Sequence, residues 1–367
     1  MKKVYLDGYI ANNLGDDLFI TMICNRYPNV EFHLIGYYSI NPMPANLIIH
    51  RIPIKNKIIN RLERLTKRIE TDSYINGHIK SKDYDCLIRI IGSGYMQKDK
   101  VFSPINPIYD NLFYKENSYV VGCNFGPYYS DEFLSYYKEL FKKLSGITFR
   151  DQYSYLLFKE LDHSVVAPDI LFGLDISSYN IEKNRNSVLI SVMDLSYGDY
   201  INRAEYNHEY YRVIKDTIQK LIDKGYQVTL LGMCEIEGDY GVAQRLQKDL
   251  IPLKINIISY PTNNIREVLD TIAKSEYIIS TRFHSFVLGT VFGCKILPIS
   301  YNIKIENTIN EVGFKEDYIT LNQLRDLDGT GVVNKLINNQ FFEAPNYIKA
   351  NAQRHFCFID ERLKDHN

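Results

Sequence analysis

The sequence predicts an α/β protein made of two Rossmann-like lobes, and three observations point to that class. Strand-like apolar runs alternate with helix-like segments along the whole chain, as in parallel sheets covered by helices. With 367 residues the chain exceeds one ordinary hydrophobic core, so two domains are expected. A polar, turn-rich stretch, SSYNIEKNRN, interrupts the series within residues 175–186 and indicates a linker.

This linker sets the expected domain boundaries. They are a first lobe over residues 1–174, a second lobe over residues 187–325 and a helical tail over residues 326–367. Packing of the tail back onto the first lobe is one option that its position leaves open.

The first lobe begins with a strand followed by a helix over about residues 16–25, where Asp16 and Asp17 complement the helix dipole. Residues 55–82 are polar and helical, which indicates an excursion between strands. The strands expected in this lobe cover residues 4–7, 31–35, 86–91, 119–123 and 147–149, and the apolar pair 165–166 leads to Pro168-Asp169, the last buried feature of this lobe.

The second lobe repeats the alternation of strands and helices. Its expected strands cover residues 187–192, 227–231, 255–258, 277–280 and 296–301, and its expected helices cover residues 207–224, 240–250 and 265–274. In open α/β sheets, ligands bind at the edge where the carboxyl ends of the strands meet. Polar residues that directly follow these strands are therefore the candidate site residues.

Composition excludes several classes of function. A net charge of −1 and the lack of long basic runs argue against a nucleic-acid-binding protein. The six cysteines occur singly without metal-type spacing, which is typical of reduced core cysteines in a cytoplasmic protein. The sequence shows no signal-peptide pattern and no apolar run long enough to span a bilayer, while peripheral contact with lipids stays open.

The segment Asn13-Leu14-Gly15-Asp16 lies between the first strand and the first helix, where nucleotide-binding folds place a phosphate loop. It matches neither GxGxxG nor GxxxxGK[ST], which disfavours a dinucleotide or Walker-type site. Backbone N–H groups at the helix start are able to hold an anion. A plain turn capped by Asp16 fits the spacing equally well.

Three further motifs follow strands of the first lobe. Gly92-Ser93-Gly94 permits the close approach of a ligand or of a neighbouring backbone, and Asn124 follows the next strand. Arg150 ends the strand after that, where a guanidinium can hold a carboxylate or phosphate in a bidentate grip without losing its charge. A surface pair of Arg150 with Asp151 is the alternative interpretation.

Three basic side chains follow consecutive strands of the second lobe: Arg282 and His284 come after residues 277–280, and Lys304 after residues 296–301. On an extended backbone Arg282 and His284 point the same way, whereas at a helix start their amides would face an anion. Histidine can give or take a proton near neutrality. A core histidine beside a structural arginine is the alternative, but the three strand ends together favour an anionic substrate and a proton transfer.

Taken in order, the motifs NNLGDD, IIGSG, NFGP, FRDQYS, VAPDILF, STRFHS and SYNIK resemble those of the polysaccharide pyruvyl transferase family. The resemblance extends from about residue 5 to residue 313, and GSG stands where the family often has three glycines. It implies a glycosyltransferase-B-like architecture with the active site in the cleft between two lobes. It also implies phosphoenolpyruvate as donor and a sugar diol as acceptor, giving a pyruvate ketal in surface polysaccharide biosynthesis.

Site residues follow from the same resemblance. It implies catalytic roles for His284, Arg282 and Arg150, and substrate binding by Lys304, Asn13, Gly15, Asp16, Ser93 and Asn124. Arg150 and Lys304 would hold the anionic groups of the donor with assistance from Arg282. Protonated His284 would protonate the methylene carbon or assist the departure of phosphate.

The implied reaction needs no metal or other cofactor, because phosphoenolpyruvate is itself the co-substrate. The expected partner is a sugar or a lipid-linked oligosaccharide. The expected location is the cytoplasm, with the inner face of the membrane as one option.

Two other functions stay open. A nucleotide-sugar glycosyltransferase of the same two-lobed fold would release a nucleotide, and Glu235 and Glu237 would then be placed to bind sugar or ribose hydroxyls. A solvated polar loop is the other interpretation of those two acids. A non-catalytic sugar- or anion-binding protein is the second alternative, which the set of four basic residues disfavours.

Overall fold

The chain forms two compact units. The computed structural model describes residues 1–52, 72–97, 99–197 and 203–364. Unit 1 comprises Met1–Ile10, Asp16–Ile170 and Asn351–Asn367, and unit 2 comprises Ala11–Gly15 and Leu171–Ala350. A short N-terminal segment thus belongs to unit 2, whereas the end of the chain belongs to unit 1.

Unit 1 is built on a parallel sheet with the order β3-β2-β1-β4-β5-β6-β7. Its strands are β1 (Lys2–Gly8), β2 (Val30–Gly36), β3 (Leu47–Arg51), β4 (Cys86–Ile90), β5 (Ser118–Cys123), β6 (Gly146–Phe149) and β7 (Ser164–Val166). The order reverses between β1 and β4, which makes their carboxyl ends the switch point where ligands of such sheets bind.

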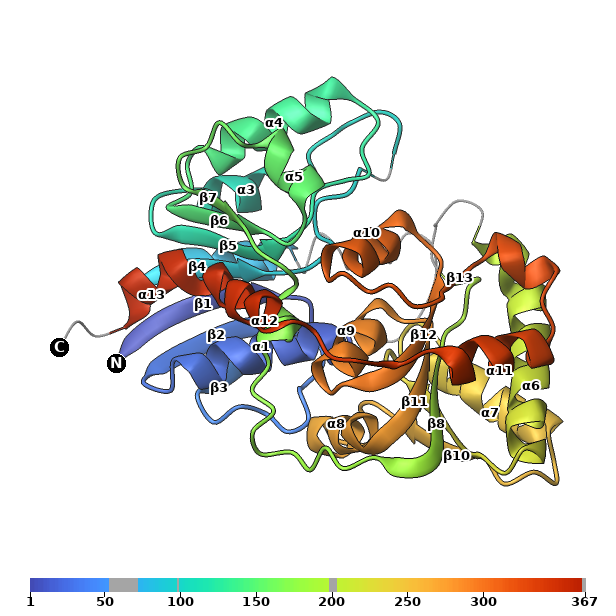
Figure 1. Ribbon diagram of the computed structural model, residues 1–367. Coiled ribbons are helices and arrows are strands. Elements are labelled where there is room, and N and C mark those ends of the chain that lie inside the picture. The colour runs from blue at the N-terminus through green and yellow to red at the C-terminus, as the bar shows by residue number, and fades with distance from the viewer. Residues whose placement is uncertain (53–71, 98, 198–202, 365–367) are drawn as a thin grey trace, which may run out of the picture. The chain divides into compact units, whose positions relative to one another are not determined.

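Helices of unit 1 connect these strands or come from the chain terminus (Figure 1). Among them are α1 (Leu14–Arg26), α3 (Pro107–Phe113), α4 (Asp131–Phe141), α5 (Gln152–Leu157), the 3-10 helix η4 (Gln353–Phe356) and α13 (Cys357–Leu363). Asp16 and Asp17 lie in the first turn of α1, as the sequence predicted from the helix dipole.

Unit 2 repeats this topology with the strand order β10-β9-β8-β11-β12-β13, and β14 adds antiparallel to β12. Its strands are β8 (Asn184–Val192), β9 (Gln227–Gly232), β10 (Asn256–Ser259), β11 (Ser275–Ser280), β12 (Cys294–Ser300), β13 (Ile319–Thr320) and β14 (Phe341–Phe342). The order reverses between β8 and β11. Their carboxyl ends form the switch point of this unit.

Helices cover both faces of the unit 2 sheet: α6 and α11 pack together on one face, and α8 and α9 on the other (Figure 1). The helices are α6 (Asn207–Asp223), α7 (Asp239–Asp249), α8 (Ile265–Lys274), α9 (Phe283–Val291), α10 (Ile303–Glu311), α11 (Gly329–Asn338) and, at the unit boundary, α12 (Asn346–Ala352). The 3-10 helices are η1 (Ile170–Gly173), η2 (Ala204–Tyr206) and η3 (Asn322–Arg325).

Each unit has its own core of buried aliphatic and aromatic side chains. Burial on both faces of the sheet explains why β5, residues 188–192 of β8 and residues 277–280 of β11 are mostly apolar runs rather than alternating patterns. All six cysteines are free thiols, and five of them are buried. In the described parts of the chain, every helix is too short or too polar to cross a lipid bilayer.

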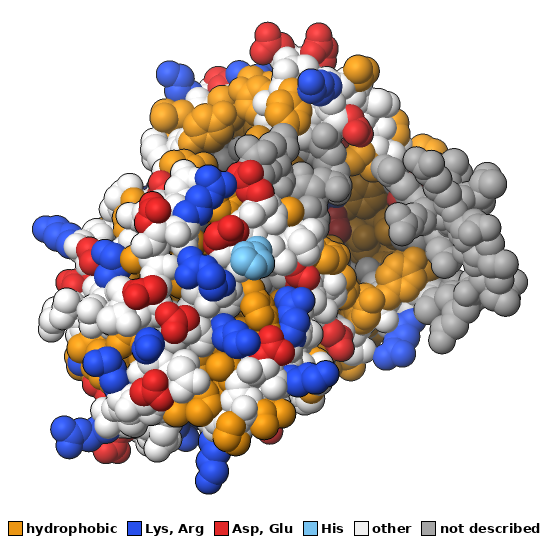
Figure 2. All heavy atoms as spheres, turned by 90° about the vertical axis from the view of Figure 1, so that its right-hand side faces the viewer, with side chains coloured by type: hydrophobic (Ala, Val, Ile, Leu, Met, Phe, Trp, Pro, Cys, Tyr) orange, Lys and Arg blue, Asp and Glu red, His pale blue; other side chains and the backbone are white. Residues whose placement is uncertain are grey.

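The surface is of mixed charge on the face shown in Figure 2, where basic and acidic side chains are interspersed. Such a face offers no single-sign track for a polyanion.

The expected alternation is confirmed, with strand and helix ends mostly within about two residues of those predicted. Helix α1 begins at Leu14, earlier than expected. The sequence reading missed the short strand β3, and it had no signal for β13 and β14, which contain two residues each. Of the expected excursion over residues 55–82, residues 55–71 lie outside the described residues and residues 72–81 are helical.

Candidate functional site

Arg282 and His284 lie where β11 passes into α9, at the switch point of unit 2. Arg282 is the N-cap residue with an extended backbone (φ −75°, ψ 137°), and His284 lies in the first helical turn. Of the two backbone conformations considered from the sequence, the helix start is the one observed. The two side chains are therefore attached to the edge where open α/β sheets bind ligands.

The guanidinium of Arg282 is held by two carboxylates. Its Nε donates to Oδ2 of Asp239 at 3.0 Å, its Nη2 pairs with the other oxygen of Asp239, and its Nη1 pairs with Glu237. Burial alone would lower the pKa of Arg282, but the charges of Asp239 and Glu237 hold it well above its ordinary value. Arg282 therefore stays cationic within a cluster that carries one more negative charge than positive.

Asp239 organises more than the arginine. Its side chain is fully buried, and Oδ2 also accepts the backbone N–H groups of Met233 (3.1 Å) and Cys234 (2.9 Å). The carboxylate thus fixes the turn after β9 and the guanidinium together. Hydrogen bonds of this charge-assisted kind are about twice as strong as neutral ones.

The same turn holds the N-terminal segment Ala11–Gly15. Asn12 Nδ2 donates to Oε2 of Glu235 at 2.5 Å, and the backbone N–H of Leu14 donates to the carbonyl of Met233 at 2.9 Å. Glu235 therefore has a protein partner, which neither of the two sequence interpretations of this acid anticipated.

Gly15 lies directly against the imidazole of His284. A Cβ at position 15 would stand 1.7 Å from Nδ1 of His284 and 2.4 Å from Cε1, so a side chain has no room there. Asn13 adjoins this contact, because its Oδ1 accepts the N–H of Gly15 at 3.1 Å and its backbone bridges to Cys234. The glycine is needed for close approach of the backbone to a functional side chain.

Lys304 and Asp16 are placed differently from this group. Lys304 lies half-buried in the first turn of α10, after β12, which runs parallel to β11, so it shares an edge of the sheet with His284. Asp16 lies half-buried in the first turn of α1 and belongs to unit 1. Unit 2 therefore brings Asn13, Gly15, Arg282 and His284 into one neighbourhood, with Lys304 on the same edge.

Unit 1 gathers a second group around Arg150. Nη1 of Arg150 contacts Oδ2 of Asp169 at 3.0 Å, and Nη2 donates to Oγ of Ser93 (3.0 Å) and Oδ1 of Asn124 (2.9 Å). Ser93, Asn124 and Arg150 follow the neighbouring strands β4, β5 and β6, so the parallel sheet itself assembles the cluster. Three residues predicted from separate motifs thus meet at one guanidinium.

Local structure explains the residues on either side of Arg150. A Cβ at Gly92 would lie 2.6 Å from Nη1 of Arg150, so the glycine makes room for the guanidinium. Asp151 caps α5 by accepting the N–H of Ser154 at 2.8 Å. The carboxylate next in sequence to Arg150 therefore serves the helix.

Sequence reasoning missed the carboxylates that hold the two arginines. Asp169 is 19 residues from Arg150, and Asp239 is 43 residues from Arg282. Asp169 is part of the VAPDILF motif, and Asp239 lies two residues after Glu237, one of the acids considered for a sugar site. Their position just beyond a strand was the available signal, but pairing across such separations depends on the strand order.

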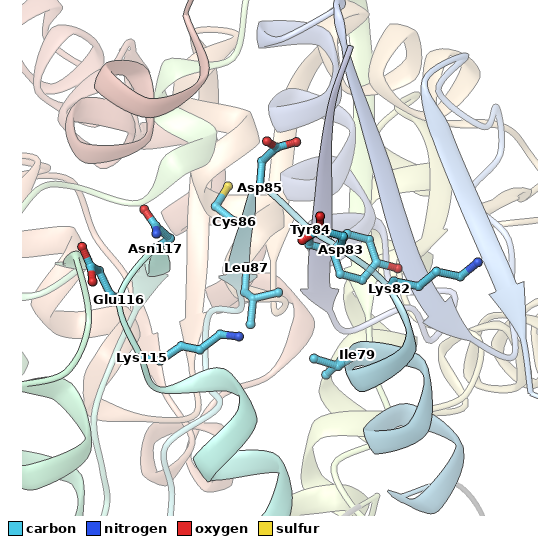
Figure 3. A pocket seen from close by; sticks show the side chains of 10 residues that line it. All are labelled: Ile79, Lys82, Asp83, Tyr84, Asp85, Cys86, Leu87, Lys115, Glu116 and Asn117. Carbon is cyan, nitrogen blue, oxygen red and sulfur yellow. The ribbon is translucent and has the colours of Figure 1, made fainter.

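A separate pocket lies in unit 1 between the segments that lead into β4 and β5 (Figure 3). Acidic, basic and apolar side chains line it, among them Lys82, Asp85, Leu87 and Lys115. It opens at the amino ends of these strands, the edge opposite Arg150, and so it does not belong to the candidate site.

Comparison with known families identifies the chain. The sequence profile of the family described as polysaccharide pyruvyl transferase matches residues 13–303. The chain belongs to this family. The matched span includes Asn13, Gly15, Arg150, Arg282 and His284, so the resemblance seen in the motifs is confirmed.

A curated relative is the amylovoran biosynthesis protein AmsJ of Erwinia amylovora. It is 23% identical over 385 residues, which cover 91% of this chain and 89% of AmsJ. The family description places the chain among the transferases, as a polysaccharide pyruvyl transferase.

Solved structures share the fold at low sequence identity. The UDP-GlcNAc 2-epimerase of Methanocaldococcus jannaschii has a TM-score of 0.58 at 12% identity, covering 98% of this chain and 100% of the epimerase. A structure described as "OtsA apo structure" has a TM-score of 0.51 at 8% identity and covers both chains fully. The expected fold class of two Rossmann-like lobes, glycosyltransferase-B-like, is confirmed.

Proposed function

We propose that this protein transfers the enolpyruvyl group of phosphoenolpyruvate to two hydroxyls of a sugar and so forms a pyruvate ketal. The observation that carries the proposal is His284 at the switch point of unit 2, inside the span that matches the family, with Lys304 on the same edge of the sheet. A proton donor on an edge that also carries a cation suits an anionic enol ester that must be protonated at carbon. That the active site occupies the cleft between the lobes stays a prediction.

Each basic group has a proposed part. Arg150, whose named partners include two neutral oxygens, binds the carboxylate or phosphate of the donor in a bidentate grip. Lys304 supplies a further positive charge on the edge that carries His284. Arg282 mainly keeps Asp239 and Glu237 in place, because its guanidinium already pairs with both carboxylates.

The chemistry balances with His284 as the acid. Protonated His284 delivers its proton to the methylene carbon, which becomes a methyl group and leaves an oxocarbenium-like centre at the adjacent carbon. One sugar hydroxyl attacks that centre and passes its proton to His284, which is thereby reprotonated. The C–O bond to phosphate then breaks with its electron pair on the phosphate, the second hydroxyl bonds to the same carbon and closes the ketal, and its proton leaves with the inorganic phosphate. Phosphoenolpyruvate acts as co-substrate, and no step requires another cofactor.

The acceptor is proposed to be a sugar of a polysaccharide precursor, free or lipid-linked. Membership of the polysaccharide pyruvyl transferase family and the similarity to AmsJ, an amylovoran biosynthesis protein, support this class of acceptor. We propose reaction in the cytoplasm, with contact to the inner face of the membrane where the acceptor is lipid-linked.

The assay that tests the function measures phosphate release from phosphoenolpyruvate with and without lipid-linked glycans, together with acid-labile pyruvate on the glycan. Acceptor-dependent phosphate release supports the proposal. Release of a nucleotide from a nucleotide sugar would instead establish the glycosyltransferase alternative.

The variant His284→Ala separates catalysis from binding. We expect kcat to fall at least ~100-fold while donor binding, followed by calorimetry, persists. His208→Ala is the matched control, because the side chain of His208 is 86% exposed. Full activity in His284→Ala would remove this residue from the mechanism, and binding without turnover in the wild-type protein would favour the non-catalytic alternative.

A further inference from the structure

The C-terminal segment of the chain places a histidine directly behind the Arg150 cluster. His355 lies in η4, belongs to unit 1 and is 1% exposed. Its Nε2 lies 2.7 Å from the carbonyl oxygen of Pro168, and its Nδ1 lies 2.8 Å from Oγ1 of Thr148. Thr148 lies two residues before Arg150, and Pro168 lies directly before Asp169. One imidazole ring therefore contacts both of the segments that carry the arginine–carboxylate pair.

The partners of His355 determine its tautomer. A carbonyl oxygen only accepts, so Nε2 carries the proton and donates it to Pro168. Nδ1 is then the acceptor for the hydroxyl of Thr148, whose oxygen in turn accepts the N–H of Gly122 at 3.0 Å. A continuous chain of hydrogen bonds therefore runs from β5 through β6 and η4 to the turn after β7.

The bond to Pro168 fixes the peptide that carries Asp169. The carbonyl of Pro168 and the N–H of Asp169 belong to the same planar unit, so holding one orients the other. Asp169 is 3% exposed and contacts Nη1 of Arg150 at 3.0 Å. Orientation of the Asp169 carboxylate in turn sets the direction of the guanidinium.

The rest of the tail anchors this histidine firmly. Asp360 in α13 accepts from Nε (2.9 Å) and Nη2 (2.6 Å) of Arg26 and from the hydroxyl of Tyr27 (2.6 Å). A Cβ at Gly146 would lie 2.4 Å from the ring of Phe358, so α13 packs closely on the start of β6. The segment that directly follows His355 is thus fixed against α1 and β6.

We propose that His355 is a positioning residue of the donor site, which aims Arg150 at the anionic donor through Pro168 and Asp169. The inference rests on the proposed function, because it takes Arg150 as the residue that binds phosphoenolpyruvate. It makes the end of the chain, about 200 residues beyond Arg150 in sequence, a working part of the unit 1 site.

Two substitutions at the same position separate positioning from packing. In His355→Gln the side-chain amide reaches the place of Nε2 and can still donate to Pro168, whereas in His355→Asn it reaches only the place of Nδ1. We expect the KM for phosphoenolpyruvate to rise about tenfold in His355→Asn, to stay within about threefold of wild type in His355→Gln, and kcat to change less than about twofold in both. His163→Asn is the control, since its Nε2 meets the carbonyl of Phe141 away from the site.

Three results would overturn the proposal: equal KM values in all these proteins, an equal rise in both His355 variants, or a fall in kcat alone. If His355→Asn is too unstable to assay, Thr148→Val replaces it, with an expected threefold rise because the ring loses the hydroxyl that orients it. An unchanged KM in Thr148→Val and His355→Gln would then contradict the role.

A second readout does not depend on turnover. Phenylglyoxal modifies arginine side chains, and peptide mass spectrometry reports the rate at each position. We expect faster labelling of Arg150 in His355→Asn than in His355→Gln, with the rate at Arg282 unchanged as the internal reference. If the wild-type protein does not consume phosphoenolpyruvate, the proposed function fails while this experiment still decides whether His355 positions Arg150.

Discussion

Arg150 in unit 1 and Arg282 in unit 2 both follow a buried strand, and both side chains are 10% exposed, yet their neighbours differ. The named partners of Arg150 are the carboxylate of Asp169 and the neutral oxygens of Ser93 and Asn124. Arg282 contacts the carboxylates of Asp239 and Glu237. Two arginines at equivalent strand ends therefore have different electrostatic environments.

We therefore assign donor binding to Arg150 and a structural role to Arg282. A guanidinium that contacts neutral oxygens can exchange them for the anionic oxygens of a ligand at little electrostatic cost. A guanidinium between two carboxylates would have to leave one of them buried with its charge unpaired. Substitutions of the residues that hold Arg282 should therefore affect stability first, whereas those around Arg150 should affect donor affinity first.

The largest expected effect comes from Asp239→Ala. It removes one of the two carboxylates that pair with the buried guanidinium of Arg282, and it removes the acceptor of two backbone N–H groups. We expect the free energy of unfolding to fall by about 3–5 kcal/mol. Urea unfolding followed by circular dichroism measures the loss, and hydrogen exchange in β8 and β11 localises it to unit 2. Asp169→Ala should cost less, because it removes one hydrogen bond to Arg150, whereas Asp239→Ala removes two to Arg282 and two to backbone N–H groups; an equal loss in both variants would break the comparison.

We expect His355 to make the stability of unit 1 sensitive to acid. Burial lowers the pKa of this histidine from 6.5 to about 4, so the unfolded chain takes up the proton first. Stability is then complete above about pH 6.5 and falls as the pH drops toward 4, by about 3 kcal/mol in total.

The measurement for this acid effect is the thermal midpoint of wild type and His355→Gln at several pH values. Burial also lowers the pKa of His50 and of His78, but both proteins contain these residues, so their effect cancels in the difference. The variant should lose less stability than wild type between pH 6.5 and 4. Parallel curves would show that His355 does not titrate as its buried position requires.

Both sheets and the positions of the basic residues could be predicted from sequence, because apolar runs and the residues after them are local signals. The partners of those basic residues could not. Asp239 reaches Arg282 only because β9 and β11 flank β8, and His355 reaches Thr148 only because η4 packs against β5 and β7, the strands on either side of β6. Strand order and the path of the tail decide these contacts, and neither follows from the spacing of residues along the chain.

Gly15→Ala tests whether unit 2 contributes to catalysis as well as to stability. The new methyl group would occupy the place of the His284 ring, so the imidazole must move by an ångström or more. We expect kcat to fall about 100-fold, because such a displacement misaligns the acid with the donor carbon. The control is Gly241→Ala in α7, which has no atom within 4 Å of the added carbon. Equal kcat values in both variants would separate His284 from the chemistry.

The smallest expected effect comes from Glu237→Gln, which makes the Arg282 cluster more like the Arg150 cluster. The side chain of Glu237 is 24% exposed, and its neutralisation leaves Arg282 paired with Asp239 alone among its named carboxylates. Loss of one negative charge near an anionic donor should lower the KM for phosphoenolpyruvate about threefold at low salt, and less at high salt. Glu276→Gln is the matched control, because Glu276 also pairs with a cation, Lys295, but lies at the amino end of β11. An unchanged KM in Glu237→Gln, or an equal decrease in Glu276→Gln, would mean that the charge of the Arg282 cluster does not affect donor binding.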